Sequence, residues 1–314
     1  MKNKDLISIL DLGEAEILSI FQTAEELKQG RDKNKLPLAG KIIGMIFQKP
    51  STRTRVSFEV GIYQLGGFPI FLNANELQLK RGESMKDTAK VLSSYLDGMV
   101  IRAYAHKDVM ELAHYSTISV INGLTDLLHP CQIISDVFTI MESRQINRTN
   151  PKLSDFSNIK IVYVGDGNNV ANSWMEMAVK LGMKLIVCTP QGYETDKKIL
   201  SHCLKLSKKT GARIEISSNP GMAVKGADVI YTDVWESMGN EAGRKINKKA
   251  FRDFQLNQRL LACAKKGVII MHCLPAHRGE EITDEVMDGP NSVIFNQAEN
   301  RLHVQKAIMK LLIK

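Results

Sequence analysis

The chain has 314 residues, about twice the length of a typical domain, so the sequence predicts two domains with substantial cores. Its 44% hydrophobic and 24% charged residues are ordinary for a globular protein and exclude a disordered or collagen-like chain. Lysine and arginine outnumber aspartate and glutamate by 42 to 34, and this net charge of +8 suits anionic metabolites or nucleic acid without choosing between them.

The cysteines and the N-terminus indicate the compartment. The five cysteines are an odd number and include no C-x-x-C pair, which argues against a disulfide framework and against a zinc knuckle. The N-terminal segment has only a short apolar run before Asp11, unlike a secretory or transit peptide, and no apolar stretch approaches the ~20 residues that span a bilayer. We therefore expect a cytoplasmic protein with no membrane partner.

Short apolar runs alternate with amphipathic stretches along the chain, which is typical of βαβ units with parallel sheets. The expected strands cover residues 41–47, 68–72, 98–102, 118–123, 159–164, 184–188, 212–216, 227–231 and 267–271. A polar stretch at 147–158 separates the fourth strand from the fifth. The sequence thus predicts an α/β protein of two doubly wound domains, 1–149 and 150–297, each with a mostly parallel sheet flanked by helices. The segment 298–314 has helical spacing and is expected to pack back on the first domain.

The most informative motif is PSTRTRVSFE at residues 50–59, directly after the first expected strand. Ser51 or Thr52 can cap a helix there, and a helix N-terminus at the carboxyl edge of a parallel sheet suits phosphate. Arg53 and Arg55 add bidentate donors to the same turn. The helix is expected to bury its apolar face, formed by Val56, Val60 and Tyr63. A capped surface helix with both arginines in ordinary ion pairs is the alternative.

Polar residues also stand at the ends of later strands. Arg102 ends the third expected strand, and His129 and Gln132 follow the fourth. Because ligands bind outside the carboxyl ends of strands in open α/β sheets, we expect these three residues to converge with Arg53 and Thr54 on one small anion.

A glycine-containing turn at residues 165–169 follows the first strand of the second domain and has part of a dinucleotide-binding pattern. Val170 replaces the third glycine of G-x-G-x-x-G, and the next strand ends without an acidic residue for a ribose, which argues against a nicotinamide-dependent oxidoreductase. Asp166 and Asn169 are expected at the strand end, where the Asn169 amide can bind a carboxylate or an ammonium group. The alternative is that the glycines only permit a tight turn.

Two further strand ends carry candidate residues. Asp233 begins the loop DVWESMG, and the last strand runs into HCLPAHRG at residues 272–279. Cys273 can be a nucleophile, a metal ligand with His272 or His277, or a neighbour of a substrate amine. The metal interpretation is disfavoured because the sequence shows no tight set of ligands around this cysteine.

Five motifs together, in this order across nearly the whole chain, resemble the aspartate/ornithine carbamoyltransferase family: STRTRVSFE, HPCQ, GDGNNVANS, DVWESMG and HCLPAHRG. The first two are shared family-wide and imply carbamoyl phosphate, whereas the S-M-G loop and the H-C-L-P segment resemble the ornithine branch. The resemblance implies a two-domain α/β homotrimer with the active site between domains and near subunit contacts. The implied reaction transfers the carbamoyl group of carbamoyl phosphate to the δ-amine of L-ornithine, giving citrulline and phosphate.

The resemblance also implies the roles of individual residues. The expected carbamoyl phosphate contacts are Ser51, Thr52, Arg53, Thr54, Gln78, Arg102, His129, Gln132, Cys273, Leu274 and Arg301. Gln78 matches a position that reaches into the neighbouring subunit's site. The expected ornithine contacts are Asn169, Asp233, Ser237 and Met238. The expected catalytic residues are Arg102, His129 and Cys273, and neither a cofactor nor a catalytic metal is expected.

Other functions fit the sequence less well. A nucleic-acid binder is disfavoured because the basic residues are not interleaved with aromatic ones and no RNA-binding motif occurs. A carbamoyltransferase for another amine, such as putrescine, is the nearest alternative, and the S-M-G loop argues against it.

Overall fold

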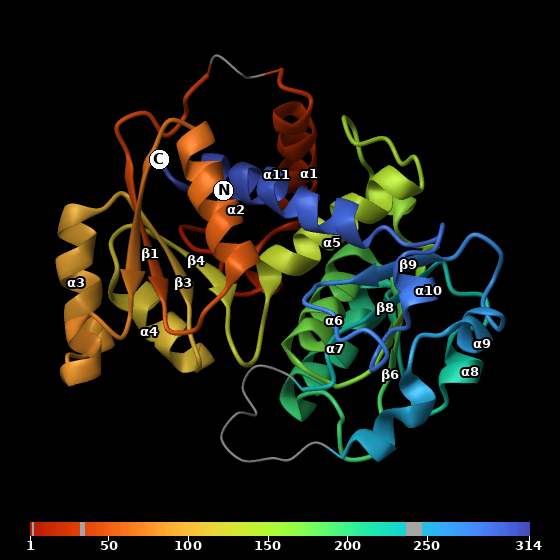
Figure 1. Cartoon of the computed structure of the whole chain (residues 1–314). Coiled ribbons are helices and arrows are strands. Elements are labelled where there is room, and N and C mark those ends of the chain that lie inside the picture. The colour runs from red at the N-terminus through yellow and green to blue at the C-terminus, as the bar shows by residue number, and fades with distance from the viewer. Residues whose placement is uncertain (2, 32–34, 237–246) are drawn as a thin grey trace. The chain divides into compact units, whose positions relative to one another are not determined.

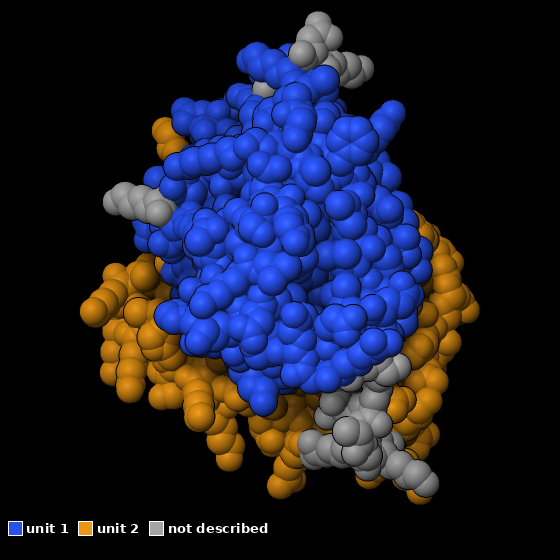
Figure 2. Space-filling model, turned by 90° about the vertical axis from the view of Figure 1, so that its left-hand side faces the viewer, with its two compact units in different colours: residues 1–138, 147–151, 299–314 blue, residues 139–146, 152–298 orange. Residues whose placement is uncertain are grey.

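The computed structural model describes residues 1, 3–31, 35–236 and 247–314. The chain divides into two compact units, drawn in different colours in Figure 2. Unit 1 comprises Met1–Phe138, Asn147–Pro151 and Glu299–Lys314, and unit 2 comprises Thr139–Ile146 and Lys152–Ala298. Two helices, α5 (Pro130–Ser143) and α11 (Ile294–Leu312), contribute residues to both units, whereas the sequence suggested boundaries after residues 149 and 297.

Unit 1 is built on a four-stranded parallel sheet in the order β2-β1-β3-β4 (Figure 1). Its strands are β1 (Ile42–Phe47), β2 (Phe68–Asn73), β3 (Gly98–Arg102) and β4 (Ser119–Leu124). Its other elements are α1 (Glu14–Lys28), α2 (Thr52–Gln64), α3 (Met85–Tyr95), α4 (His106–Tyr115) and the short 3-10 turns η1 (Ile9–Asp11) and η2 (Gln78–Arg81). Apolar residues of α3 and α4 pack with those of β1, β3 and β4 in one buried cluster.

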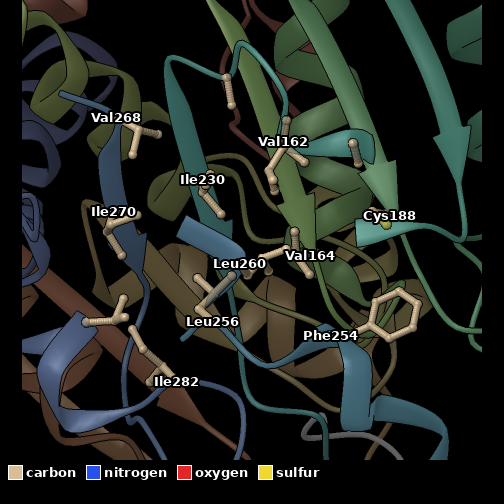
Figure 3. Close-up of a cluster of buried hydrophobic side chains, with 14 of the residues drawn as sticks. Val162, Val164, Cys188, Ile230, Phe254, Leu256, Leu260, Val268, Ile270 and Ile282 are labelled. Atoms are coloured by element: carbon tan, nitrogen blue, oxygen red, sulfur yellow. The ribbon is translucent and has the colours of Figure 1, made fainter. Parts of the chain in front are cut away.

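Unit 2 holds a five-stranded parallel sheet in the order β7-β6-β5-β8-β9. Its strands are β5 (Lys160–Val164), β6 (Lys184–Cys188), β7 (Arg213–Ser217), β8 (Val229–Thr232) and β9 (Ile269–His272). Its helices are α6 (Asn169–Leu181), α7 (Lys197–Thr210), α8 (Pro220–Ala223), α9 (Gln258–Leu261) and α10 (Asp284–Met287), with 3-10 turns η3 (Leu153–Asp155) and η4 (Lys248–Phe254). Figure 3 shows the buried cluster in which side chains of β5, β8 and β9 meet those of η4 and α9.

All nine expected strands are present, each within two residues of its expected bounds, and the α/β class with two parallel sheets is confirmed. The helix α11 begins at Ile294, before the expected start at residue 298, and its residues from Glu299 onward belong to unit 1. Among the described residues, no helix is long and apolar enough to cross a membrane.

The expected buried face of α2 is wrong. Val56, Val60 and Tyr63 are exposed, with 51%, 36% and 77% of their surface accessible. The helix instead buries Thr54, Phe58, Gly61 and Ile62. Gly61 allows close packing on α11, because a Cβ atom at this position would lie 3.2 Å from the side chains of Lys306 and Met309. The spacing predicted an amphipathic helix, but both of its faces carry apolar residues, so spacing alone could not select the buried one.

Candidate active site

The N-terminus of α2 lies at the carboxyl end of β1, as the sequence predicted. Ser51 is the N-cap, and its hydroxyl accepts a hydrogen bond of 3.2 Å from the Thr54 backbone amide. Ser51 and Thr52 line a pocket of about 660 Å³ together with Lys49 and Arg55. The positive end of the helix dipole and the Lys49 ammonium group make this pocket suitable for an anion.

Thr54 stands where two arginines meet inside unit 1. Its hydroxyl oxygen accepts hydrogen bonds from Arg301 Nη2 at 2.7 Å and from Arg102 Nη1 at 3.3 Å. All three residues are buried, with at most 4% of their surface exposed. Because the oxygen accepts from two guanidinium groups, the hydroxyl hydrogen is available for donation to a ligand. The cluster therefore offers several donors around one point, as expected for binding an anionic oxygen.

The backbone near Arg102 shows how the sheet makes room for this cluster. The pairing of β3 with β4 shifts register between Ile101 and Arg102, an irregularity of the kind that re-aims a side chain at a strand end. Gly123 lies opposite in β4, and a Cβ atom there would lie 3.2 Å from the Ile101 carbonyl oxygen and 3.6 Å from the Thr54 methyl group. Glycine thus permits the close approach of β4 to the Ile101 carbonyl of β3 at this irregularity.

His129 directly precedes α5 and is 4% exposed. Burial holds the pKa of its imidazole well below the usual value, and the positive charges of Arg301 and Arg102 lower it further. The ring is therefore neutral at physiological pH. Its single N–H group can donate a hydrogen bond to a ligand, while the ring itself does not act as a general acid. Gln132, in the first turn of α5, donates a hydrogen bond of 2.8 Å to Asp136, which fixes the orientation of its amide.

Two residues expected to take part in anion binding do not join the Thr54 cluster. Arg55 pairs with Glu59 at 3.3 Å and stacks on Phe71, with the guanidinium carbon 3.6 Å from the ring centroid, so it does not add its donors to the capped turn. Gln78 is exposed on η2, and in the described part of this single chain no contact joins it to Thr54. Arg53 occupies the second position of α2 and is half-buried.

In unit 2, three neighbouring strands bring polar residues to one edge. Asp233 follows β8, Cys273 follows β9, and Asn168 follows β5 at the N-cap of α6. The Asp233 carboxylate accepts hydrogen bonds from Cys273 Sγ at 2.9 Å and from Asn168 Nδ2 at 2.7 Å. It also accepts a 2.8 Å bond from the Val234 amide, so this buried charge is stabilised and oriented by three donors.

Asn168 is a functional candidate that the sequence reasoning missed. Its side-chain oxygen accepts from the Val170 amide at 2.9 Å, which caps α6, while its amide group binds Asp233. The predicted neighbour, Asn169, is the first residue of α6 and is 7% exposed. The general preference for asparagine at N-caps was the available signal. Gly167 serves the same turn, because a Cβ atom there would lie 2.4 Å from the Thr195 backbone nitrogen.

Cys273 and Leu274 lie on the loop after β9, where the expectation that no tight set of metal ligands surrounds Cys273 is wrong. The fold brings ligand atoms of Asp233, His272 and Cys273 within 4.8 Å of one another. However, both ring nitrogens of His272 are engaged, Nδ1 with the Leu274 amide at 2.9 Å and Nε2 with Glu281 at 3.1 Å. A metal ion would have to displace one of these bonds. Ser237 and Met238 lie outside the described residues.

Comparison with known proteins identifies the family. The model "Aspartate/ornithine carbamoyltransferase, carbamoyl-P binding domain" matches residues 4–142, and "Aspartate/ornithine carbamoyltransferase, Asp/Orn binding domain" matches residues 157–312. The chain belongs to the aspartate/ornithine carbamoyltransferase family. The Thr54 cluster thus falls in the first matched region, except for Arg301, and the Asp233 cluster falls in the second.

Relatives within the carbamoyltransferase family are similar over the full length. The chain is 52% identical to an ornithine carbamoyltransferase of Syntrophus aciditrophicus, covering 99% of each chain, and 51% identical to one of Thermococcus kodakarensis, covering 100% of this chain and 97% of the relative. The solved structure of ornithine carbamoyltransferase from Pyrococcus furiosus has a TM-score of 0.90 at 50% identity, covering 98% of this chain and 96% of that one.

Proposed function

We propose that the protein is an ornithine carbamoyltransferase, which transfers the carbamoyl group of carbamoyl phosphate to the δ-amine of L-ornithine. The Thr54 hydroxyl held between the guanidinium groups of Arg102 and Arg301 is the observation that carries the proposal. Cationic and hydroxyl donors lie together in this cluster, and an acyl phosphate requires such donors for its negatively charged oxygens. The relatives and the solved structure named above are ornithine enzymes, which favours ornithine over putrescine as the acceptor.

Residues of unit 1 bind and activate carbamoyl phosphate in this proposal. The capped N-terminus of α2, with Ser51, Thr52 and Arg53, holds the phosphate. Arg102, Thr54 and neutral His129 donate to the carbamoyl oxygen, on which negative charge develops as the amine attacks. Gln132 and Arg301 complete the expected contacts. Carbamoyl phosphate is already an activated mixed anhydride, so these donors suffice for its chemistry and no cofactor or metal is assigned a step.

Residues of unit 2 bind the amino acid. The Asp233 carboxylate, oriented by Asn168, pairs with the α-ammonium group of ornithine, and Asn169 with Ser237 and Met238 completes the ornithine contacts. The δ-amine must lose its proton before it attacks, since only the neutral amine is a nucleophile. We assign Cys273 and Leu274 to the neighbourhood of the δ-amine. The Cys273 thiol donates to the Asp233 carboxylate, which in this proposal pairs with the α-ammonium group.

The protein is further proposed to be a cytoplasmic homotrimer with no membrane or nucleic-acid partner. Val56, Val60 and Tyr63 form an exposed apolar stripe at helical spacing on α2, and Phe68 on β2 is 69% exposed. Contact with a second copy would cover this surface. The exposed position of Gln78 fits a residue that acts in the site of a neighbouring copy. The five cysteines are all free, which suits a reducing compartment.

An acceptor comparison tests the proposed function. Purified protein is given carbamoyl phosphate with L-ornithine, putrescine or L-aspartate, and carbamoylated product and phosphate are both quantified. We expect kcat/KM for ornithine to exceed that for the other two amines by at least about 10³-fold, because putrescine leaves the buried polar groups of the ornithine site unpaired. A higher kcat/KM for putrescine would contradict the assignment of the acceptor, and absence of transfer to every amine would contradict carbamoyl transfer itself.

A further inference from the structure

A buried acid–histidine pair beside Cys273 has no role in the mechanism above. His272 ends β9 and is 1% exposed, and Glu281 lies nine residues later and is completely buried. Their side chains meet through His272 Nε2 and Glu281 Oε1 at 3.1 Å. A buried charged group is costly unless hydrogen bonds hold it, so this arrangement requires an explanation.

Glu281 binds both ends of the loop that carries Cys273. The same Oε1 atom that faces His272 also accepts a hydrogen bond of 2.5 Å from the His277 backbone amide. One carboxylate oxygen thus closes residues 272–277 into a loop. Its second oxygen is buried without a hydrogen-bond partner among the described residues.

The hydrogen bonds fix the form of the imidazole. The Leu274 amide donates to His272 Nδ1 at 2.9 Å, so this nitrogen carries no proton. The ring proton therefore lies on Nε2 and points to Glu281, as in other pairs where a carboxylate selects the histidine tautomer. Leu274 has a φ of 60°, an unfavourable conformation for a leucine, and the bond to His272 stabilises it.

The loop is also anchored by Gln297 of α11. The His272 backbone amide donates to Gln297 Oε1 at 2.9 Å, and Gln297 Nε2 donates to the Tyr231 hydroxyl at 3.1 Å. These bonds fix the backbone of His272, while Glu281 fixes its side chain. Cys273, between the anchored histidine and the strained leucine, is then directed at Asp233.

We propose that Glu281 is a positioning residue which, through the tautomer and orientation of His272, holds Cys273 and Leu274 in the conformation that presents the thiol to Asp233. The relevance of this to catalysis rests on the proposed function, in which Cys273 and Asp233 contact ornithine. The geometry of the thiol does not depend on that function and can be measured without substrate.

Thiol alkylation measures this geometry directly. Cys131, Cys188 and Cys203 are buried, and burial raises the pKa of each of these thiols to about 12, so they react slowly. Cys263 is exposed, and a Cys263→Ser background removes its reaction. The rate of iodoacetamide modification of Cys273, followed by peptide mass spectrometry on the full chain, then reports how the thiol is held.

Glu281→Leu should raise the alkylation rate of Cys273 about tenfold, because the released thiol loses its hydrogen bond to Asp233. Glu281→Gln should stay within about twofold of the parent, since an amide oxygen can still accept from both His277 and His272. Glu281→Asp keeps the charge on a shorter side chain and should give an alkylation rate of Cys273 between those of the parent and the leucine variant. It replaces the leucine variant as the test if that variant does not fold. Glu280→Leu is the matched control, because the Glu280 carboxylate pairs with Lys248 at 2.6 Å rather than with the loop.

Activity gives the second readout. In the Cys263→Ser background, kcat/KM for ornithine should fall about 30-fold in Glu281→Leu, and the glutamine variant should recover most of it. Equal alkylation rates in the folded leucine, aspartate and parent proteins would overturn the positioning role. A parent protein without carbamoyl transfer would contradict the proposed function alone, because the alkylation comparison contains no substrate.

Discussion

Arg102→Ala should lower kcat/KM for carbamoyl phosphate by about 10² to 10³-fold, the usual consequence of removing one donor to a developing oxyanion. The change removes one of the two guanidinium groups that donate to the Thr54 hydroxyl. Among the described contacts, Arg301 is then the remaining cationic donor to that hydroxyl. Initial rates at saturating ornithine, together with calorimetric titration of carbamoyl phosphate, separate the loss in binding from the loss in catalysis.

Two variants make this test of Arg102 specific. Arg102→Lys keeps the charge but not the planar fork of donors, so it should restore less than about a tenth of the lost activity. Arg213→Ala removes an exposed arginine at the start of β7 and should leave kinetics unchanged. Wild-type kcat/KM in a folded Arg102→Ala protein would show that the Thr54 cluster is structural only.

Asp233→Asn should raise KM for ornithine about 100-fold and change KM for carbamoyl phosphate little, because the neutral amide no longer pairs with an ammonium group. The amide also has one acceptor fewer for the bonds that Asp233 receives from Cys273, Val234 and Asn168. Discrimination between ornithine and putrescine should change little, because putrescine carries an ammonium group at the same spacing from the reacting amine and lacks only the α-carboxylate.

The control for Asp233 is Asp253→Asn, which neutralises an exposed carboxylate on η4. Steady-state kinetics with each substrate varied in turn provides the comparison. An equal rise in both KM values would indicate a general disturbance of the loop after β8. An unchanged KM for ornithine would remove Asp233 from the ornithine site.

The sheets and the positions of several site residues could be predicted from local sequence. Parallel strands buried on both faces are continuous apolar runs, which makes inner strands such as β1, β3, β5 and β8 recognisable one by one. The edge strands β2 and β7 are more exposed and are recognisable by their β-branched and aromatic residues. Because strand ends share one edge of a parallel sheet, Arg102 and Thr54 were expected to meet, and they do. The cap at Ser51 follows from the short-range preference of serine for this position.

The remaining features depend on contacts between distant parts of the chain. The bond between Asn168 and Asp233 spans 65 residues, and that between Thr54 and Arg301 spans 247, so no local pattern reveals either partner's geometry. The buried face of α2 is decided by packing on α11, which periodicity does not report. The acceptor role of Glu281 could not be predicted either, because an acidic residue in a polar loop is usually exposed.

The proposed reaction forms one carbon–nitrogen bond, between the carbamoyl carbon and the δ-nitrogen of ornithine, and isotope labelling detects that bond. The protein is incubated with ¹³C-labelled carbamoyl phosphate and L-ornithine carrying ¹⁵N at the δ position, and the product is examined by NMR. We expect citrulline with a one-bond ¹³C–¹⁵N coupling, and one phosphate released for each citrulline formed. Attachment of the ¹³C-labelled carbamoyl group to the unlabelled α-nitrogen, or phosphate release without a carbamoylated product, would contradict the proposed reaction.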